Sequence, residues 1–411
     1  MSVSERKEGA GLSPGRVALA LALLLGLQPI TTDLYLPALP LLAADLAAPM
    51  AAVQLTMSAL LLAFGLAQLV AGPVADRHGR RPVLLWGLGL YTAASVGAAS
   101  AADIHWLIAW RAAQGLGLAA SVVCARAMVR DLYPPHEGAH VMSRGLSGLG
   151  LIAILAPGLG GWMAATAGWR AALGLVAGAG VLTLLYVWRA VPESIGQRNP
   201  QALAPGPLWR SLGQVAGHPA FRAWTALISA TYGGLFVFLA GSSFVYIGAL
   251  GLPAWGYGLA MATCSASYLA GTFLCRHWLQ RHGLAGTVRR GGVFTLAGGL
   301  GLLALGLSDT RHIAPVLLAH WLYTFGHGIH QPCGQAGAVG AFPRQAGVAS
   351  ALSGFALALT AFLTGLWMGQ AMDGSLRMLS VGVAAFALLT TLVAWTLVQR
   401  HGEQFAARPA T

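Results

Sequence analysis

The chain has 411 residues, of which 56% are hydrophobic and only 9% are charged. Soluble domains carry about 25% charged residues, so this composition excludes an ordinary soluble enzyme and indicates a polytopic membrane protein. The net charge of +12 does not indicate nucleic-acid binding, because the cations are dispersed over many short segments, whereas a nucleic-acid site needs them clustered on one face.

Twelve segments are long and apolar enough to cross a bilayer. A spanning helix needs about 20 mostly apolar residues, and lipid leaves few other ways to satisfy the backbone. The polar, acidic N-terminus is not typical of a secretory signal, so we expect the first segment to stay as a helix. The sequence therefore predicts an all-α fold of twelve transmembrane helices, over residues 17–39, 51–75, 82–101, 105–130, 138–164, 171–190, 221–247, 255–278, 288–307, 313–340, 346–371 and 377–399.

Lysine and arginine are distributed unequally over the connecting loops. With the N-terminus inside, twenty of the 24 cations fall on the cytoplasmic side, from Arg6 and Lys7 to Arg408. Only Arg170, Arg311 and Arg377 fall outside, and Arg111 lies within a helix. Short cytoplasmic loops hold such an excess, so we predict a multi-pass membrane protein with both termini in the cytoplasm.

A long polar stretch divides the twelve segments six and six. Residues 191–219, rich in proline, glycine and glutamine, predict a cytoplasmic linker between an N-terminal bundle (1–190) and a C-terminal bundle (220–411). Such duplicated halves are typical of secondary transporters. Two patterns recur in matching places: Arg77-His78-Gly79 as Arg281-His282-Gly283, and the spacing of Trp110, Gly115 and Gly117 as Trp321, Gly326 and Gly328.

Two ionisable side chains, Asp33 and Arg111, lie deep in apolar sequence. A charge at that depth costs about 2.5 to 3.5 kcal/mol on insertion scales and is usually functional. Both residues fall at similar depth, so we expect them to meet. Arginine would favour the carboxylate and burial the neutral acid, so a conformational change could switch the proton of Asp33. The structural alternative is a static ion pair that only orders two helices.

Further polar and aromatic residues are candidates for the wall of a cavity that accepts a mostly apolar molecule. Three histidines in one helix could line such a cavity, carry a second proton or bind metal, but soft metals need a compact ligand set that is not evident here. We predict no metal and no cofactor. The candidates are Gln28, Tyr35, Met57, Gln114, Tyr232, Phe236, Phe238, Tyr268, His320, His327 and His330.

The loop after the second segment reads Gly72-Pro-Val-Ala-Asp76-Arg77-His-Gly79-Arg80-Arg81-Pro82. It resembles the signature between helices 2 and 3 of the major facilitator superfamily. In physical terms, Gly72 would allow close helix contact, Asp76 could accept hydrogen bonds from a neighbouring helix N-terminus, and Gly79 would turn the chain. The resemblance implies a latch on the outward-facing state; the alternative is that the three arginines only anchor the topology.

Two more stretches resemble motifs within that superfamily. Arg111-Ala-Ala-Gln114-Gly115-Leu-Gly117 is similar to a motif of proton-coupled members. The run Ala156-Pro157-Gly158-Leu-Gly160-Gly161 is similar to the antiporter motif of drug exporters, although tight packing alone could explain its last two glycines.

Three stretches from the first to the eleventh segment resemble the Bcr/CflA group of drug exporters: Thr32 to Pro40, Ala125 to Tyr133 and Ala346 to Phe355. The resemblance covers nearly the whole chain. It implies a twelve-helix, proton-driven exporter of hydrophobic drug-like molecules in the bacterial inner membrane, with proton-coupled uptake or metabolite or metal transport as alternatives. We expect the protein to work as a monomer. ATP is excluded as the driver within this chain, because a phosphate-binding loop needs a Gly-Lys pair and the only lysine is Lys7. We therefore predict a transporter and no enzyme.

Overall fold

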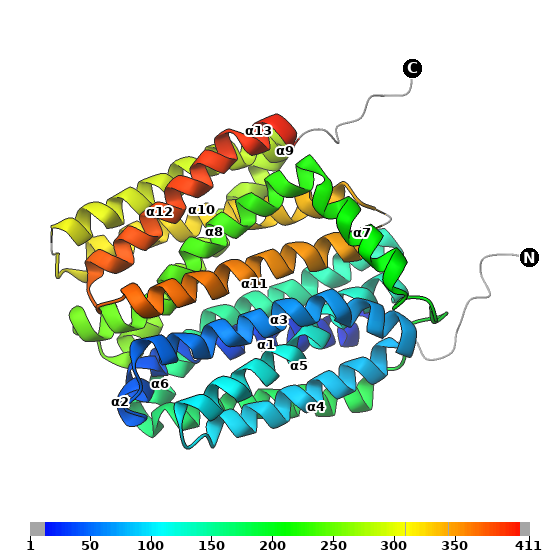
Figure 1. Cartoon of the computed structure of the whole chain (residues 1–411), viewed down its shortest axis with the longest axis horizontal. Helices are drawn as coiled ribbons and strands as arrows, with labels where there is room; N and C mark the ends of the chain where they lie inside the picture. The colour runs from blue at the N-terminus through cyan, green and yellow to red at the C-terminus, as the bar shows by residue number, and fades with distance from the viewer. Residues whose placement is uncertain (1–12, 309, 344, 403–411) are drawn as a thin grey trace, which may run out of the picture.

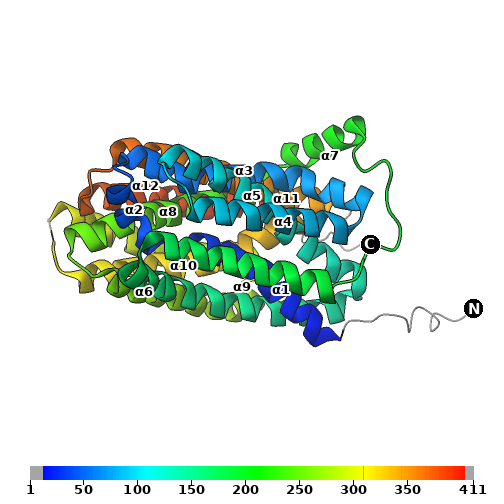
Figure 2. The same ribbon diagram turned by 90° about the horizontal axis from the view of Figure 1, so that it is seen from below.

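The computed structural model describes residues 13–308, 310–343 and 345–402. This part of the chain is helical and contains no strand. Its long helices run roughly parallel along the longest axis (Figure 1). The start of α1 and the end of α13 lie at the same end of the molecule, which we call the terminal end. The short helix α2 lies at the opposite end, which we call the far end (Figures 1 and 2). Four cations used above for orientation, Arg6, Lys7, Arg344 and Arg408, lie outside the described residues.

The first half of the chain forms one group of packed helices. In it, α1 packs on α6, whereas α3 and α4 pack on α5. The elements are α1 (Pro14–Thr32), η2 (Leu36–Ala38), α2 (Leu39–Asp45), α3 (Met50–His78), α4 (Arg80–Ala99), α5 (Ile104–Leu132) and α6 (Pro135–Ala190).

The second half repeats this arrangement. Here α9 packs on α10 and α12, and α8 packs on α10, α11 and α12. The elements are α7 (Pro205–Gly217), α8 (Pro219–Ser243), η3 (Phe244–Ala249), α9 (Ala254–Leu307), α10 (Ile313–Gly340), α11 (Ala346–Ala371), α12 (Leu376–Trp395) and α13 (Leu397–His401).

Nine helical stretches of the described residues are long and apolar enough to cross a membrane. Two of them, α6 and α9, each break into two helices at a glycine with positive φ, Gly168 (83°) and Gly283 (63°). The histidine-bearing α10 is outside the nine. Dividing α6 and α9 and adding α10 gives the twelve predicted helices, with ends close to the predicted ones.

Two segments differ from the prediction. The segment expected as one helix over 17–39 stops at Thr32 and resumes as η2, because Pro37 and Pro40 lack the amide hydrogens that a continuous helix would use. Within the predicted linker, residues 205–217 form α7, which crosses the terminal end beside α11 (Figure 1). Prolines lie in its first turn, where proline is favoured because the N–H that it lacks would have no partner within the helix.

At the far end the two halves are in direct contact. The amide Nε2 of Gln54 on α3 donates a hydrogen bond of 2.8 Å to the carbonyl of Ala240 on α8. Gly258 on α9 lies against the backbone of Pro157 on α6, and Gly161 lies against the carbonyl of Ala254. Since small residues let helices approach closely, this end of the interface between the halves is closed.

Candidate substrate cavity and coupling residues

A cavity of about 270 Å³ lies between the halves, enclosed by α1, α6, α8, α9 and α10. Most of its wall is apolar, as ligand sites usually are, and Asp33 is the only carboxylate in it. Six of the candidate residues line it: Gln28, Asp33, Tyr232, Phe238, Tyr268 and His327. We call it the central cavity.

Six other candidates are absent from this wall: Tyr35, Met57, Gln114, Phe236, His320 and His330. All six are buried inside one half of the protein. The hydroxyl of Tyr35, for example, shares a 2.9 Å hydrogen bond with Thr56. In this structure these six therefore do not border the central cavity, because a helix presents its residues on several faces and apolar sequence does not show which face borders the opening.

Asp33 directly follows α1 as its C-cap: its backbone is still helical (φ −79°, ψ −33°) and its N–H donates to the carbonyl of Pro29. Its carboxylate accepts a hydrogen bond of 2.7 Å from Thr32 Oγ1 and faces the central cavity. Among the described residues no ion pair joins it to Arg111. The expected direct contact was therefore wrong: similar depth is a necessary condition for contact, but Asp33 faces the central cavity whereas Arg111 bonds to Thr31 and Gln114.

Arg111 is fully buried on α5 and reaches the backbone of α1 instead. Its Nη2 donates to the carbonyl of Thr31 at 3.0 Å, and its Nη1 donates to Gln114 Oε1 at 2.7 Å. The guanidinium carbon lies 4.4 Å from the centre of the Tyr35 ring, a distance suited to a cation–π contact. The last carbonyls of a helix lack partners and carry partial negative charge, so Arg111 caps the end of α1.

A second layer of hydrogen bonds holds this cap. The Nε2 of Gln114 donates to Ser95 Oγ at 2.7 Å, and the hydroxyl of Ser95 donates to the carbonyl of Tyr91. The hydroxyl of Tyr91 in turn lies 2.6 Å from Thr31 Oγ1. Residues of α1, α4 and α5 are thus tied together at the helix break that presents Asp33.

The three histidines of α10 have separate surroundings. His327 lines the central cavity and lies 3.1 Å from Thr231 Oγ1. The Nδ1 of His320 lies 2.5 Å from the hydroxyl of Tyr246, and the Nε2 of His330 lies 3.1 Å from the carbonyl of Val288. No group of three potential metal ligands occurs among the described residues.

Two further cavities continue from the central cavity toward the terminal end. A cavity of about 130 Å³ shares Gln28 and Tyr232 with the central cavity. A cavity of about 400 Å³, reaching α7, shares Gln68, Arg126 and Ser350 with the smaller one. We call these the narrow cavity and the vestibule. The shared wall residues place the three cavities next to one another in a series, from the vestibule beside α7 to the central cavity with Asp33.

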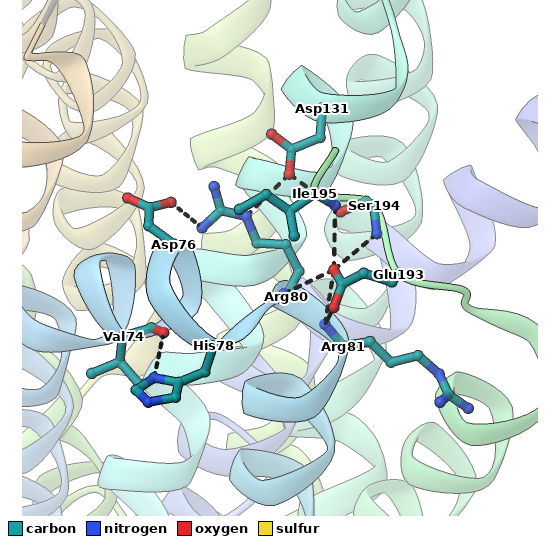
Figure 3. A network of polar contacts seen from close by, with 9 residues as sticks. All are labelled: Val74, Asp76, His78, Arg80, Arg81, Asp131, Glu193, Ser194 and Ile195. Carbon is teal, nitrogen blue, oxygen red and sulfur yellow. Dashed lines mark hydrogen bonds and ion pairs between the residues drawn. The ribbon is translucent and has the colours of Figure 1, made fainter. Parts of the chain in front are cut away.

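The loop between α3 and α4 forms a polar network at the edge of the vestibule (Figure 3). Arg80 contacts the carboxylates of Asp76 at 2.5 Å and Asp131 at 3.0 Å. Glu193 accepts the backbone N–H of Arg80 at 2.9 Å, and Arg81 donates through Nε to the carbonyl of Val191. The loop is therefore bound to α5 and to the start of the linker, all within the first half.

The predicted roles in this loop have mixed outcomes. Gly79 has φ of 104°, a conformation that favours glycine, and this confirms the predicted turn. Gly72 lines the vestibule, and a Cβ there would meet its nearest neighbour, Val123, at an ordinary 3.9 Å, so the predicted close helix contact is not formed. Asp76 bonds to Arg80, not to the N-terminus of another helix, and Arg77 is exposed.

Glu193 was missed in the sequence. Its carboxylate accepts hydrogen bonds from backbone N–H groups at the first residues of α4, where an anion is stabilised by the helix dipole. The chain has only 12 acidic residues. A carboxylate just after the last helix of the first half is therefore unusual in this sequence, and it could have indicated a partner for the arginine-rich loop.

The run Ala156 to Gly161 packs α6 against two partners. Gly160 lies against the carbonyl of Leu34, directly after Asp33, and Gly161 lies against Ala254 of the other half. Ala156 is buried, whereas a Cβ on Gly158 would meet nothing within 4 Å. The motif thus supports both the broken end of α1 and the closed far end.

A family model described as Major Facilitator Superfamily matches residues 21–365. The chain belongs to the major facilitator superfamily. As a major facilitator it has the twelve-helix fold in two pseudo-symmetric bundles and is a multi-pass protein of the inner membrane. This assignment agrees with the loop signature and with the Bcr/CflA resemblance.

Several relatives are drug-resistance proteins by name. The chain is 29% identical to multidrug resistance protein D of Escherichia coli, over 94% of this chain and 97% of the relative. It is 27% identical to a chloramphenicol resistance protein of Pseudomonas aeruginosa (89% and 82% covered). It is 25% identical to a bicyclomycin resistance protein homolog of Haemophilus influenzae (93% and 96% covered).

Among solved structures, that of a D-xylose–proton symporter superposes with a TM-score of 0.75 at 16% identity, covering 92% of this chain and 97% of the symporter. At that identity the match concerns the fold alone. It supports the arrangement of the helices and says nothing of the molecule that this chain transports.

Proposed function

We propose that this protein exports hydrophobic drug-like molecules in exchange for protons, by alternating access. The observation that carries the proposal is Asp33, the only carboxylate in a mostly apolar cavity between the two halves. Relatives named for drug resistance support the cargo class. Protons, a drug-like solute and the lipid bilayer are the partners that this function needs, and one chain is sufficient for it.

The terminal end is assigned to the cytoplasm, on the predicted excess of arginine in cytoplasmic loops. In that orientation the series of cavities opens inward and the closed far end faces outward. A drug therefore has a route from the cytoplasm to Asp33. Export is completed when the halves tilt to close this route and open the far end, as in other transporters with duplicated halves.

Asp33 supplies the coupling. Its carboxylate has one hydroxyl donor, Thr32, and no cation within ion-pair distance, so its charge responds to the water and cargo that share the cavity. Arg111 acts as a positioning residue, because it caps α1 through Thr31 and fixes the break that presents Asp33. Proton release inward and cargo binding then compete for the same cavity.

The loop network supplies the conformational control. In this inward-open arrangement Asp76 bonds to Arg80 and borders the vestibule, whose wall also includes Gly347 and Val348 at the start of α11. Closing the vestibule would bring the N-terminus of α11 toward Asp76. A helix N-terminus stabilises an anion, so the carboxylate of Asp76 would be stabilised there. The predicted latch on the outward-facing state is therefore open here and available for closure.

Drug susceptibility of a pump-deleted bacterium tests the proposal. Expression of the intact chain should raise the inhibitory concentration of at least one amphenicol, bicyclomycin or sulfonamide at least fourfold. Asp33→Asn should abolish this protection, because the amide cannot exchange a proton. Asp45→Asn is the matched control and should retain protection, since Asp45 pairs with Arg170 at the exposed far end, where such pairs contribute little.

Two results would contradict this function. The first is a panel in which no compound is better tolerated with the intact protein. The second is greater sensitivity on expression, which would favour uptake, the alternative of the same fold.

A further inference from the structure

The wall of the vestibule carries three arginines and two aspartates, a formal net charge of +1, and two of its arginines form no ion pair with the described residues. Asp76 and Asp131 both contact Arg80, so each already has a cationic partner. Arg126 and Arg130 complete the charged residues of its wall. No carboxylate of the described residues lies within ion-pair distance of either. A solute that leaves the cytoplasm therefore first meets positive charge.

Arg126 continues into the narrow cavity, where it is the only side chain of the wall that is charged at neutral pH. Its Nη1 donates to Ser350 Oγ of the other half at 3.5 Å, so the side chain reaches across the route. The passage is narrow, about 130 Å³, and its walls are protein. Low-dielectric walls focus the field of a charge, so a cation that passes Arg126 is repelled strongly.

The other polar groups of the narrow cavity are uncharged: the hydroxyls of Tyr232 and Ser350 and the amides of Gln28, Gln68, Gln331 and Gln335. A glutamine side chain both donates and accepts hydrogen bonds without a net charge. Hydroxyl, amide and carbonyl groups of a solute can therefore replace their hydrogen bonds to water by hydrogen bonds to these side chains as the solute moves toward the central cavity.

We propose that the route selects electrically neutral, amphipathic solutes: Arg126 rejects cations in the narrow cavity, and Asp33 rejects anions in the central cavity. This inference rests on the proposed export function and specifies its substrate class. In an exchange cycle the cargo meets Asp33 after its proton has left, so an anion would lie beside a carboxylate in a confined apolar space. A neutral solute meets neither repulsion.

The wild-type protein tests this in inside-out vesicles with an imposed pH gradient. The solutes are three compounds of one amphenicol scaffold: the neutral parent, an analogue with a primary amine that is protonated, and an analogue with a free, ionised carboxylate. We expect initial uptake of the neutral compound to exceed that of each charged analogue at least tenfold. Equal uptake of the amine would overturn the charge selection while leaving export intact. Absence of uptake for all three, at matched expression, would overturn the export function and this inference together.

Substitutions of Arg126 test which residue carries the selection. The readout is the rate of uptake of the amine divided by the rate of uptake of the neutral parent. A general loss of transport activity lowers both rates and leaves this ratio unchanged. Arg126→Gln should raise the ratio at least tenfold and Arg126→Glu further, whereas Arg126→Lys, which keeps the charge, should stay within twofold of wild type. Arg289→Gln is the control, because this exposed arginine borders none of the three cavities.

An unchanged ratio in folded Arg126→Gln, or an equal rise in the Lys and Gln variants, would contradict the assignment. Retention of a monodisperse detergent-solubilised protein checks folding, and the wild-type comparison does not depend on any variant.

Discussion

Asp33 and Arg111 show what a sequence reveals about a single membrane residue. The cost of charge in lipid correctly marks both as important to the architecture, since one faces the cavity and the other caps a helix. It does not reveal their contacts. Those depend on packing: the carboxylate of Asp33 faces the central cavity, whereas Arg111 bonds to the carbonyl of Thr31.

A double-substitution cycle tests this separation. Arg111→Lys should lower the free energy of unfolding in detergent by about 1.5–3 kcal/mol, the worth of a hydrogen bond to a charged group, because a lysine cannot reach both Thr31 and Gln114. Combined with Asp33→Asn, the two effects should add within about 0.5 kcal/mol, as for residues without shared contacts. A coupling of about 3 kcal/mol, expected of a broken buried ion pair, would show that they form one in the membrane.

The histidines of α10 give the same lesson. Helical spacing correctly places His320 and His327 two turns apart, but only His327 borders the central cavity. His320 and His330 bond within the second half, to Tyr246 and to the backbone of Val288. The packing partners of a helix decide which of its faces borders a cavity, and those partners come from distant sequence.

At the scale of elements, glycines place helices α6 and α9 in backbone contact at the far end. A Cβ on Gly258 would meet the carbonyl of Pro157, and a Cβ on Gly161 would meet that of Ala254. Backbone atoms cannot move aside as a flexible side chain can. The far end therefore closes only because these positions carry no side chain.

Gly258→Ala should open the far end. A cysteine introduced at Leu239, in the wall of the central cavity, in a Cys264→Ala background, should react at least fivefold faster with an impermeant maleimide added from outside the cell. Gly158→Ala is the matched control from the neighbouring motif, since its Cβ would meet nothing within 4 Å. Equal labelling in the Gly258 and Gly158 variants would contradict this closure mechanism.

At the scale of the whole molecule, hydrophobic lengths and the repeated Arg-His-Gly pattern predicted the helices well. Gly79 and Gly283, the last residues of the two copies, both adopt positive φ and divide successive helices. The sequence did not predict α7, because helix formation in a polar segment depends on its packing beside α11. It also could not show which end of the interface is closed, since one sequence serves every state of the transport cycle.

Proton movement in reconstituted vesicles is the most direct measurement of the central claim. Vesicles with the terminal end outward carry an acidic lumen and an internal pH dye, and a transported drug is added outside. Added drug should make protons leave the vesicles through the wild-type protein. Vesicles with the Asp33→Asn variant should show no drug-dependent proton flux. Drug accumulation without proton efflux, or equal efflux through Asp33→Asn, would contradict the account.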